Sequence, residues 1–442
     1  MLVAICVWFL LFKRPIYESV LISFVVLLAV TNKWGEIWTY IDKALSTSLL
    51  FSMAAFVAMS LILTKTKIID GCIAIVLSIV GRIRGGAGYA AVIASAFMGS
   101  LSGSGPGNVM ATGVITIPAM KKSGFPPHLA ANVESTSSYL GNMIPPSSNI
   151  IAAFGAYMAF APDSDMTEGR FWIILWGVSL WFVLQRLLTV WGFCVYYKVQ
   201  PMKKEELPSL KEAFKSNWQG LLLPVVILLP FILDFLLKDN FFTARLGAAG
   251  ASYFSKSLLL FVPGMVALIC ILLVKDKKSF TPNKLAKIFS GSVKSIAPVV
   301  STCLFGYMIG ALFADLEVAA DLEAFMSSMG LGKIGIIVFI TLLTCFLGMV
   351  IPGSSLVVIF GEVIIATFAA VGVDPVLAAA MLPCICGVMC GITPPLALGM
   401  YAGMSIAESD FGKTVKNDLW WVGLQFVLQV IVLMGWLPII GL

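Results

Sequence analysis

Long apolar runs separated by short polar loops dominate the sequence. Fourteen of these runs are candidate membrane segments: 2–12, 15–31, 47–63, 87–105, 107–120, 128–161, 171–196, 219–237, 257–274, 295–313, 334–351, 354–371, 376–406 and 418–440. A helix needs about 20 apolar residues to cross the hydrocarbon core of a bilayer, so the longer runs predict transmembrane helices. Other runs are too short to cross the hydrocarbon core. Residues 109–120, for example, extend over only about 18 Å as a helix.

Composition supports a membrane environment. Of the 442 residues, 59% are hydrophobic and only 12% are charged, and the mean hydropathy is +0.98. Soluble proteins are about 25% charged. The formal charge of +6 is spread over scattered loops, so it does not indicate nucleic-acid binding. The N-terminal run lacks a basic segment and a cleavage site, and we interpret it as a span rather than a signal peptide.

Glycine and proline residues break the apolar pattern at four places. Two breaks, SLSGSGPGNV (100–109) and IPGSS (351–355), separate pairs of short runs, and two others, GNMIPPSSN (141–149) and GITPP (391–395), interrupt longer runs. Unpaired backbone groups are costly in hydrocarbon, so irregular backbone at membrane depth occurs where it lines a cavity within the protein. The sequence therefore predicts two re-entrant helical hairpins and two interrupted helices.

Basic residues orient this topology. If each hairpin enters and leaves the membrane on one side, one set of loops holds 21 of the 29 Lys and Arg residues. This set includes Arg84, Lys121, the loops 198–215 and 275–294, and Lys413. The positive-inside rule makes it cytoplasmic, so the first hairpin opens to the cytoplasm and the second to the outside.

An internal repeat relates the two halves of the chain. At an offset of 248 residues, GFPPHLAA (124–131) aligns with GVDPVLAA (372–379) at five of eight positions. Each copy lies between a hairpin break and a Pro-Pro break, and the halves open to opposite sides, so the repeat is inverted. Broken segments at matching places in inverted repeats indicate a transporter with its binding site near the membrane midplane.

We therefore expect an all-α integral membrane protein with the inverted-repeat architecture of an elevator transporter. Residues 87–161 and 334–406 are predicted to form the two halves of a moving transport domain. The segments predicted to form the scaffold are 1–86 with a connecting arm, 162–333, and the C-terminal helix 407–442. Moving a polar cargo inside a rigid block avoids exposing it to lipid.

Polar groups at the breaks suggest the chemistry of the site. Helix N-termini at such breaks attract anions, and hydroxyl and freed carbonyl oxygens suit Na⁺. Glu134 lies in the first interrupted helix, and an intramembrane carboxylate is a functional candidate by default. We leave two interpretations open for Glu134, ion coupling or substrate contact on one hand and a structural hydrogen bond on the other.

Five motifs carry a resemblance to a known family: SGSGPGN, IPAMKKSGF, GNMIPPS, GMVIPG and GITPPLAL. From about residue 50 onward the chain resembles the large membrane permease subunit of a TRAP (tripartite ATP-independent periplasmic) transporter. Glu134 and Pro352 are similar to the TAXI-type branch. The resemblance implies Na⁺-coupled import of an organic acid by an elevator mechanism in the bacterial or archaeal cytoplasmic membrane. It also implies two partners, a periplasmic solute-binding protein and a small four-helix membrane subunit.

The resemblance further implies two Na⁺ sites, each between a hairpin tip and an interrupted helix. By motif, the Na⁺ ligands are Ser102, Ser104, Asn108, Gly141 and Pro145 in the first site and Gly348, Pro352, Ser354, Gly391 and Thr393 in the second. Substrate contacts are expected from Gly105, Asn108, Asn142, Ser147, Ser355, Pro394 and Glu134.

Other functions fit the sequence less well. A self-sufficient Na⁺/carboxylate symporter of the related elevator class is the main alternative, but neither hairpin tip has its usual Ser-Asn-Thr. A membrane-embedded enzyme needs a nucleophile with a base, or metal ligands, within the bundle. His128 is the only histidine, and it lies at a predicted helix start. We therefore expect no enzyme. No phosphate-binding loop of the G-x-x-x-x-G-K-[ST] type is present, so ATP is not expected to drive transport directly.

Overall fold

The computed structural model describes residues 4–5, 7–8, 12–66, 68–203, 205, 207, 209–274, 280–328 and 330–442, and this part of the chain is helical, without strands. Five of its helices are long and apolar enough to cross a membrane, or seven when each of two bent pairs is taken as one span. The expected all-α membrane fold is thereby confirmed. The predicted segment 2–12 lies mostly outside the described residues.

The two halves of the repeat contain the same series of elements. The first half comprises α6 (Gly86–Ser102), α7 (Gly105–Lys122), α8 (Pro127–Leu140), η3 (Gly141–Met143), α9 (Ser148–Phe160) and α10 (Glu168–Tyr196). The second comprises α15 (Lys333–Gly348), α16 (Gly353–Ala370), α17 (Pro375–Leu382), the π-helix η7 (Pro383–Val388), α18 (Met389–Ile392), α19 (Leu398–Ala407) and α20 (Phe411–Leu433). Helices α15, α16 and α17 begin 247, 248 and 248 residues after α6, α7 and α8, so the sequence offset recurs in the helix starts.

Helices α6 and α7 are the antiparallel arms of the first hairpin. Near the start of α7, the Asn108 Nδ2 atom donates a hydrogen bond of 2.8 Å to the carbonyl oxygen of Ser95 in α6. One turn further along α7, the hydroxyl of Thr112 lies 3.2 Å from that of Ser95. The second hairpin consists of α15 and α16, joined through residues 349–352.

The tip of the first hairpin is shorter than SLSGSGPGNV suggests. Only Gly103 and Ser104 leave the helical path, and Gly103 adopts a left-handed conformation with φ of 62°. The Ser104 side chain caps α7 by accepting a hydrogen bond from the Gly107 N–H at 3.3 Å. Pro106 lies in the first turn of α7, where its missing N–H breaks no hydrogen bond. Proline and glycine therefore start the second arm instead of extending the break.

Both interrupted helices are present. The first runs through α8 and η3, breaks over residues 144–147 and continues as α9, and the second runs through α17, η7 and α18, breaks over 393–397 and continues as α19. Each break contains the predicted Pro-Pro pair, and each pair is joined by a cis peptide bond, Pro145–Pro146 and Pro394–Pro395.

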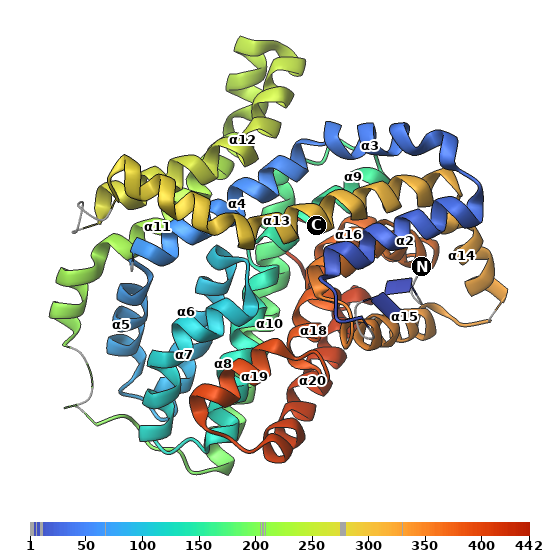
Figure 1. Cartoon of the computed structure of the whole chain (residues 1–442). Coiled ribbons are helices and arrows are strands. Elements are labelled where there is room, and N and C mark those ends of the chain that lie inside the picture. Colours follow the sequence, from blue (N-terminus) through green and yellow to red (C-terminus); the bar gives the residue numbers. More distant parts are fainter. Residues whose placement is uncertain are drawn as a thin grey trace.

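The remaining helices surround these elements. They are α2 (Ile16–Thr31), η2 (Trp34–Glu36), α3 (Ile37–Ser46), α4 (Ser48–Thr66), α5 (Ile68–Val80), α11 (Leu210–Leu237), η5 (Lys238–Phe242), α12 (Thr243–Leu273), α13 (Pro282–Asp315) and α14 (Val318–Ser328). Figure 1 shows α3 and α4 along the upper part of the molecule, with α12 projecting from it. Helix α13 packs against α2, α3, α4 and α16. Helix α5 was not among the expected segments. It has 13 residues and packs against α6 and α11.

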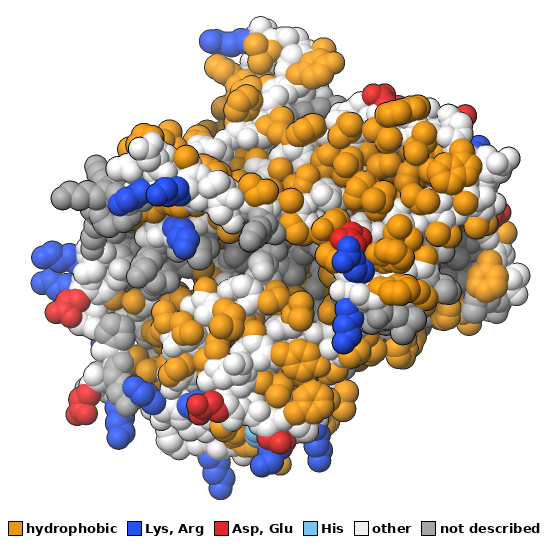
Figure 2. Space-filling model, viewed as in Figure 1, with side chains coloured by type: hydrophobic (Ala, Val, Ile, Leu, Met, Phe, Trp, Pro, Cys, Tyr) orange, Lys and Arg blue, Asp and Glu red, His pale blue; other side chains and the backbone are white. Residues whose placement is uncertain are grey.

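Several loops that were predicted to be cytoplasmic lie together. Arg84 donates a hydrogen bond of 3.0 Å from Nε to the carbonyl oxygen of Val199, and Lys121 donates one of 3.0 Å to the carbonyl oxygen of Ala407. Basic side chains gather along the lower edge in Figure 2, below α7, α8, α19 and α20. The structure thus brings these basic loops to one end of the molecule, as the charge pattern predicts.

Candidate functional site

Both hairpin tips and both broken helices meet at one cavity of about 630 Å³. The first hairpin contributes residues 103–108 and the second contributes residues 352–355. The broken helices contribute, among others, Asn142 from the first and Gly391 from the second. Helices α2, α4 and α13 complete the wall, largely with apolar side chains such as Val299. The four breaks that the sequence analysis singled out therefore surround a common space.

Five helices begin at residues that line this cavity. The hairpin and broken-helix elements among them are α7, α9, α16 and α19, which start at Gly105, Ser148, Gly353 and Leu398, and α2 starts at Ile16. The first N–H groups of a helix have no intrahelical partner and form the positive end of its dipole. The described residues that line the cavity include no charged side chain, so the helix termini set its electrostatic character. Such termini favour a carboxylate or a similar anion.

Two buried side-chain amides leave an oxygen unpartnered beside the cavity. Asn108 is 1% exposed, and its Oδ1 has no hydrogen-bond partner in the described part of the chain. The Oδ1 atom of Asn142, which is 5% exposed, is in the same situation. A buried acceptor is normally satisfied in a native protein, so an acceptor without a hydrogen-bond partner indicates a place for a donor or a cation. Amide, hydroxyl and carbonyl oxygens are hard ligands, so this donor set fits Na⁺.

The predicted site residues divide into two groups. Eight of them line the cavity: Ser104, Gly105, Asn108, Asn142, Pro352, Ser354, Ser355 and Gly391. Others lie at or beside the breaks without lining it: Gly141, Pro145, Ser147, Gly348, Thr393 and Pro394. Within this second group, the Ser147 side chain caps α9, and the Thr393 hydroxyl donates to the carbonyl oxygen of Met389 at 2.7 Å. The side chain of Ser102 lies outside the described residues, and the ligand roles of all these residues stay predictions.

Glu134 lies away from the cavity lining and is fully buried in α8. Its carboxylate accepts hydrogen bonds from Ser95, Thr112, Thr116 and Ser138, which belong to both arms of the first hairpin and to α8 itself. In the described part of the chain no Lys or Arg side chain pairs with it, so hydroxyl groups satisfy the carboxylate. This arrangement favours the structural interpretation of Glu134.

Tyr139 of α8 is a cavity residue that the sequence analysis missed. A Cβ atom added at Gly105, Gly391 or Gly399 would lie 2.5, 1.8 or 2.2 Å from the nearest atom of the Tyr139 ring. The ring therefore fits between the first hairpin tip and the second broken helix, and it lines the cavity. No local pattern marks Tyr139, because the three glycines that accommodate it come from distant parts of the chain.

Comparison with known families identifies the chain. Residues 3–440 match the model of the family described as the tripartite ATP-independent periplasmic transporter, DctM component. The chain belongs to this family. It is therefore the large permease subunit of a TRAP transporter, a multi-pass protein of the bacterial inner membrane, and the resemblance expected from the sequence is confirmed.

Several curated relatives of this DctM-family chain are named as TRAP transporter permease proteins, not as enzymes. The C4-dicarboxylate TRAP transporter large permease protein DctM of Vibrio cholerae is 25% identical over 415 residues, which cover 88% of this chain and 85% of that protein. The sialic acid TRAP transporter large permease protein SiaM of the same organism is 23% identical over 343 residues, which cover 77% and 74%.

Solved structures share the fold. MtrF of Neisseria gonorrhoeae, described as one of a class of antimetabolite efflux pumps, superposes with a TM-score of 0.66 at 14% sequence identity. The match covers 93% of this chain and 87% of MtrF. At this identity the likeness concerns the fold alone, and it agrees with the membrane-transporter architecture expected for the DctM family.

Proposed function

We propose that this TRAP permease subunit imports an organic acid together with Na⁺. The observation that carries the proposal is the composition of the cavity between the two hairpin tips. Five helix N-termini offer N–H groups to a carboxylate, and the unpartnered amide oxygens of Asn108 and Asn142 offer ligands to a small hard cation. A cavity whose described lining has no charged side chain suits an anion that enters with compensating cations, because the anion and cations together carry little net charge into the membrane.

The relatives support a carboxylate as the substrate. One is named for C4-dicarboxylates and the other for sialic acid, and both of these compounds are carboxylic acids. The cavity volume of about 630 Å³ is within the range of small-molecule sites. We infer the substrate class from these names and from the positive helix termini.

Two partners follow from the family. The description of the DctM component as part of a tripartite periplasmic transporter supports a periplasmic solute-binding protein and a small membrane subunit as the other two parts. We propose that the binding protein delivers the acid to the outward-facing side and that the small subunit, with four helices, braces the scaffold.

An elevator movement explains why the cavity lies at a boundary. One wall comes from the predicted transport domain, residues 87–161 and 334–406, and the other comes from α2, α4 and α13 of the predicted scaffold. We propose that the first group moves as one body along the second and carries the bound acid across the membrane. The matched helix starts of the two halves support this, because inverted repeats provide two related end states.

Uptake into proteoliposomes tests the proposal. The chain is reconstituted with the small membrane subunit and the binding protein, and radiolabelled succinate serves as a C4-dicarboxylate probe and sialic acid as a second probe. An inward Na⁺ gradient is expected to drive accumulation of at least one of them. Equal accumulation with Na⁺ replaced by K⁺ would contradict Na⁺ coupling, and uptake without the binding protein would contradict the tripartite arrangement.

A further inference from the structure

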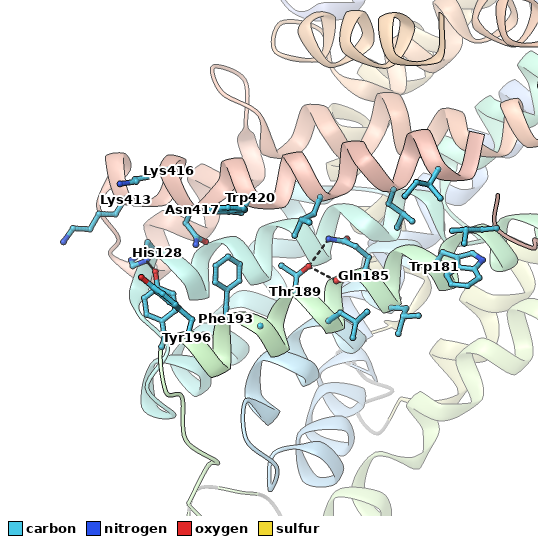
Figure 3. A pocket seen from close by; sticks show the side chains of 18 residues that line it. His128, Trp181, Gln185, Thr189, Phe193, Tyr196, Lys413, Lys416, Asn417 and Trp420 are labelled. Atoms are coloured by element: carbon cyan, nitrogen blue, oxygen red, sulfur yellow. Dashed lines mark hydrogen bonds between the residues drawn. The ribbon is translucent and has the colours of Figure 1, made fainter. Parts of the chain in front are cut away.

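A long groove runs along the outer side of α10 and α20, apart from the cavity between the hairpins (Figure 3). Its volume is about 1090 Å³. One face of each helix lines it, since lining residues recur every three or four positions, and His128 of α8 and Leu437 beyond α20 complete it. The transport mechanism proposed above does not use this groove.

Buried side-chain contacts between α10 and α20 hold the two helices that form the groove in a fixed relative position. Arg186 of α10 is fully buried, and its Nη2 atom donates a hydrogen bond to the side-chain oxygen of Gln425 in α20. Its guanidinium also lies 5.7 Å from the ring centre of Trp421. Because these buried contacts set the spacing of α10 and α20, the groove is formed before any ligand enters it.

The middle of the groove is apolar. Side chains such as Leu188, Leu424 and Leu428 line it, and Leu188 is 58% exposed within the chain. The two polar side chains there satisfy each other, because Gln185 Nε2 donates to the Thr189 hydroxyl at 2.9 Å. The groove therefore presents apolar surface to an occupant along most of its length.

Charge is confined to one end. Lys413 and Lys416 lie at that end beside aromatic side chains, whereas Trp181 lies at the other (Figure 3). Neither lysine forms an ion pair with a described residue, and the described lining contains no carboxylate. This end is the basic, predicted cytoplasmic end of the molecule. Aromatic side chains beside lysines are typical of a membrane interface.

We propose that this groove binds an anionic phospholipid of the cytoplasmic leaflet. The phosphate of the headgroup lies between Lys413 and Lys416, and the acyl chains lie along the apolar face of α10 and α20. On α20 the apolar part of the lining, from Trp420 to Ile431, extends about 17 Å along the helix, which is close to the half-thickness of about 15 Å of the hydrocarbon core. Basic pockets between transmembrane helices on the cytoplasmic side bind anionic headgroups in this way.

The charge distribution favours a lipid over a helix of a partner subunit. A lipid has one anionic end and an apolar remainder, and this polarity matches a groove with two unpaired lysines at one end and apolar side chains beyond them. A helix would present apolar side chains along its whole length and needs no pair of lysines. The groove therefore has the chemical polarity of a phospholipid.

Native mass spectrometry of the purified chain tests this proposal with phosphatidylglycerol and phosphatidylcholine as probes. Phosphatidylglycerol is expected to bind first and more tightly. The double variant Lys413→Ala/Lys416→Ala is expected to weaken this binding about 25-fold, at about fivefold per lysine, and to leave phosphatidylcholine unaffected. Leu424→Trp fills the groove without changing charge, and it is expected to weaken binding of both lipids.

A matched control removes two lysines from other cytoplasmic loops. Lys122→Ala/Lys203→Ala removes the same charge from residues that do not line the groove, and it is expected to bind phosphatidylglycerol as the native chain does. Equal affinity for the two lipids, or equal losses in the two double variants, would overturn the proposal. A photoreactive residue at position 424 in the assembled complex provides a second readout. A lipid adduct supports the proposal, and a covalent adduct with the small subunit contradicts it.

Discussion

Ser95 of α6 donates a hydrogen bond of 2.7 Å from its hydroxyl to the carboxylate of Glu134 in α8. This contact joins the first arm of a hairpin to a broken helix at a fully buried position. Thr112 and Thr116 reach the same carboxylate from the second arm. Glu134 is thus the common acceptor that holds three helices of the predicted transport domain together.

Replacing Glu134 tests this structural role. Glu134→Leu leaves the hydroxyls of Ser95 and Ser138 without their carboxylate acceptor, at about 1–3 kcal/mol each. Thr112 and Thr116 lose less, because each hydroxyl has a backbone carbonyl within reach to which its single proton can turn. We expect a clear fall in the thermal unfolding midpoint, measured by tryptophan fluorescence. Glu134→Gln keeps an acceptor oxygen and is expected to fold and transport nearly normally. Normal folding of the Gln variant with loss of Na⁺ dependence would instead make Glu134 a coupling group.

The hairpin tips show which features of the fold the sequence could predict. Gly105 and Gly353 start the second arms of the two hairpins, and the local glycine and proline signals predicted both hairpins, whereas the match of 124–131 with 372–379 predicted the repeat offset. The length of the first break was overestimated, because Pro106 is compatible with a first helical turn. Tyr139 and the groove between α10 and α20 could not be predicted. Both depend on which distant helices pack together, and neither has a local signal.

Ser104 and Ser354 lie at the two hairpin tips, and both line the cavity. If each hydroxyl is a Na⁺ ligand, Ser104→Ala and Ser354→Ala each remove one oxygen, at about 1.5 kcal/mol or roughly tenfold in the half-saturating Na⁺ concentration. Proteoliposome uptake at varied Na⁺ concentrations measures this shift. Ser104→Thr keeps both the hydroxyl and the helix cap and is expected to restore the native response. Ser257→Ala removes an exposed hydroxyl of α12 and serves as the control. An unchanged Na⁺ response in both tip variants would contradict the ion-site prediction.

Gly141 packs against the backbone of the first hairpin. A Cβ atom added at Gly141 would lie 2.3 Å from the carbonyl carbon of Gly99, and a backbone atom cannot move aside as a flexible side chain can. Gly141→Ala is therefore expected to separate the broken helix from the hairpin, with loss of transport and a lower unfolding temperature. Gly264→Ala in α12 is the matched control, since no atom lies within 4 Å of its added Cβ. Replacing glycine by alanine in an open helical position gains up to about 1 kcal/mol. Native behaviour of Gly141→Ala would show that this close approach is not required.

The predicted boundary between moving and static parts can be tested by covalent links. Gly306 of α13 belongs to the predicted scaffold, Val358 of α16 belongs to the predicted transport domain, and a Cβ at Gly306 would lie 3.2 Å from the Cβ of Val358. Paired cysteines at these positions, in a background without the native cysteines, approach the Cβ separation of about 3.8 Å found in disulfides. Oxidation is expected to block uptake, and reduction is expected to restore it.

A second pair shows whether the block reflects movement or damage. Ala156 of α9 and Gly361 of α16 both belong to the predicted transport domain, and their Cβ atoms would lie 2.7 Å apart, so a link forms after a shift of about 1 Å. Because the two helices travel together in an elevator movement, this link is expected to leave uptake unchanged. Uptake that survives a fully formed link between positions 306 and 358 would contradict the movement of α16 past α13. Loss of uptake in both linked variants would mean that cross-linking itself disturbs the fold. Loss of uptake confined to the link between positions 306 and 358 would indicate that α16 moves past α13.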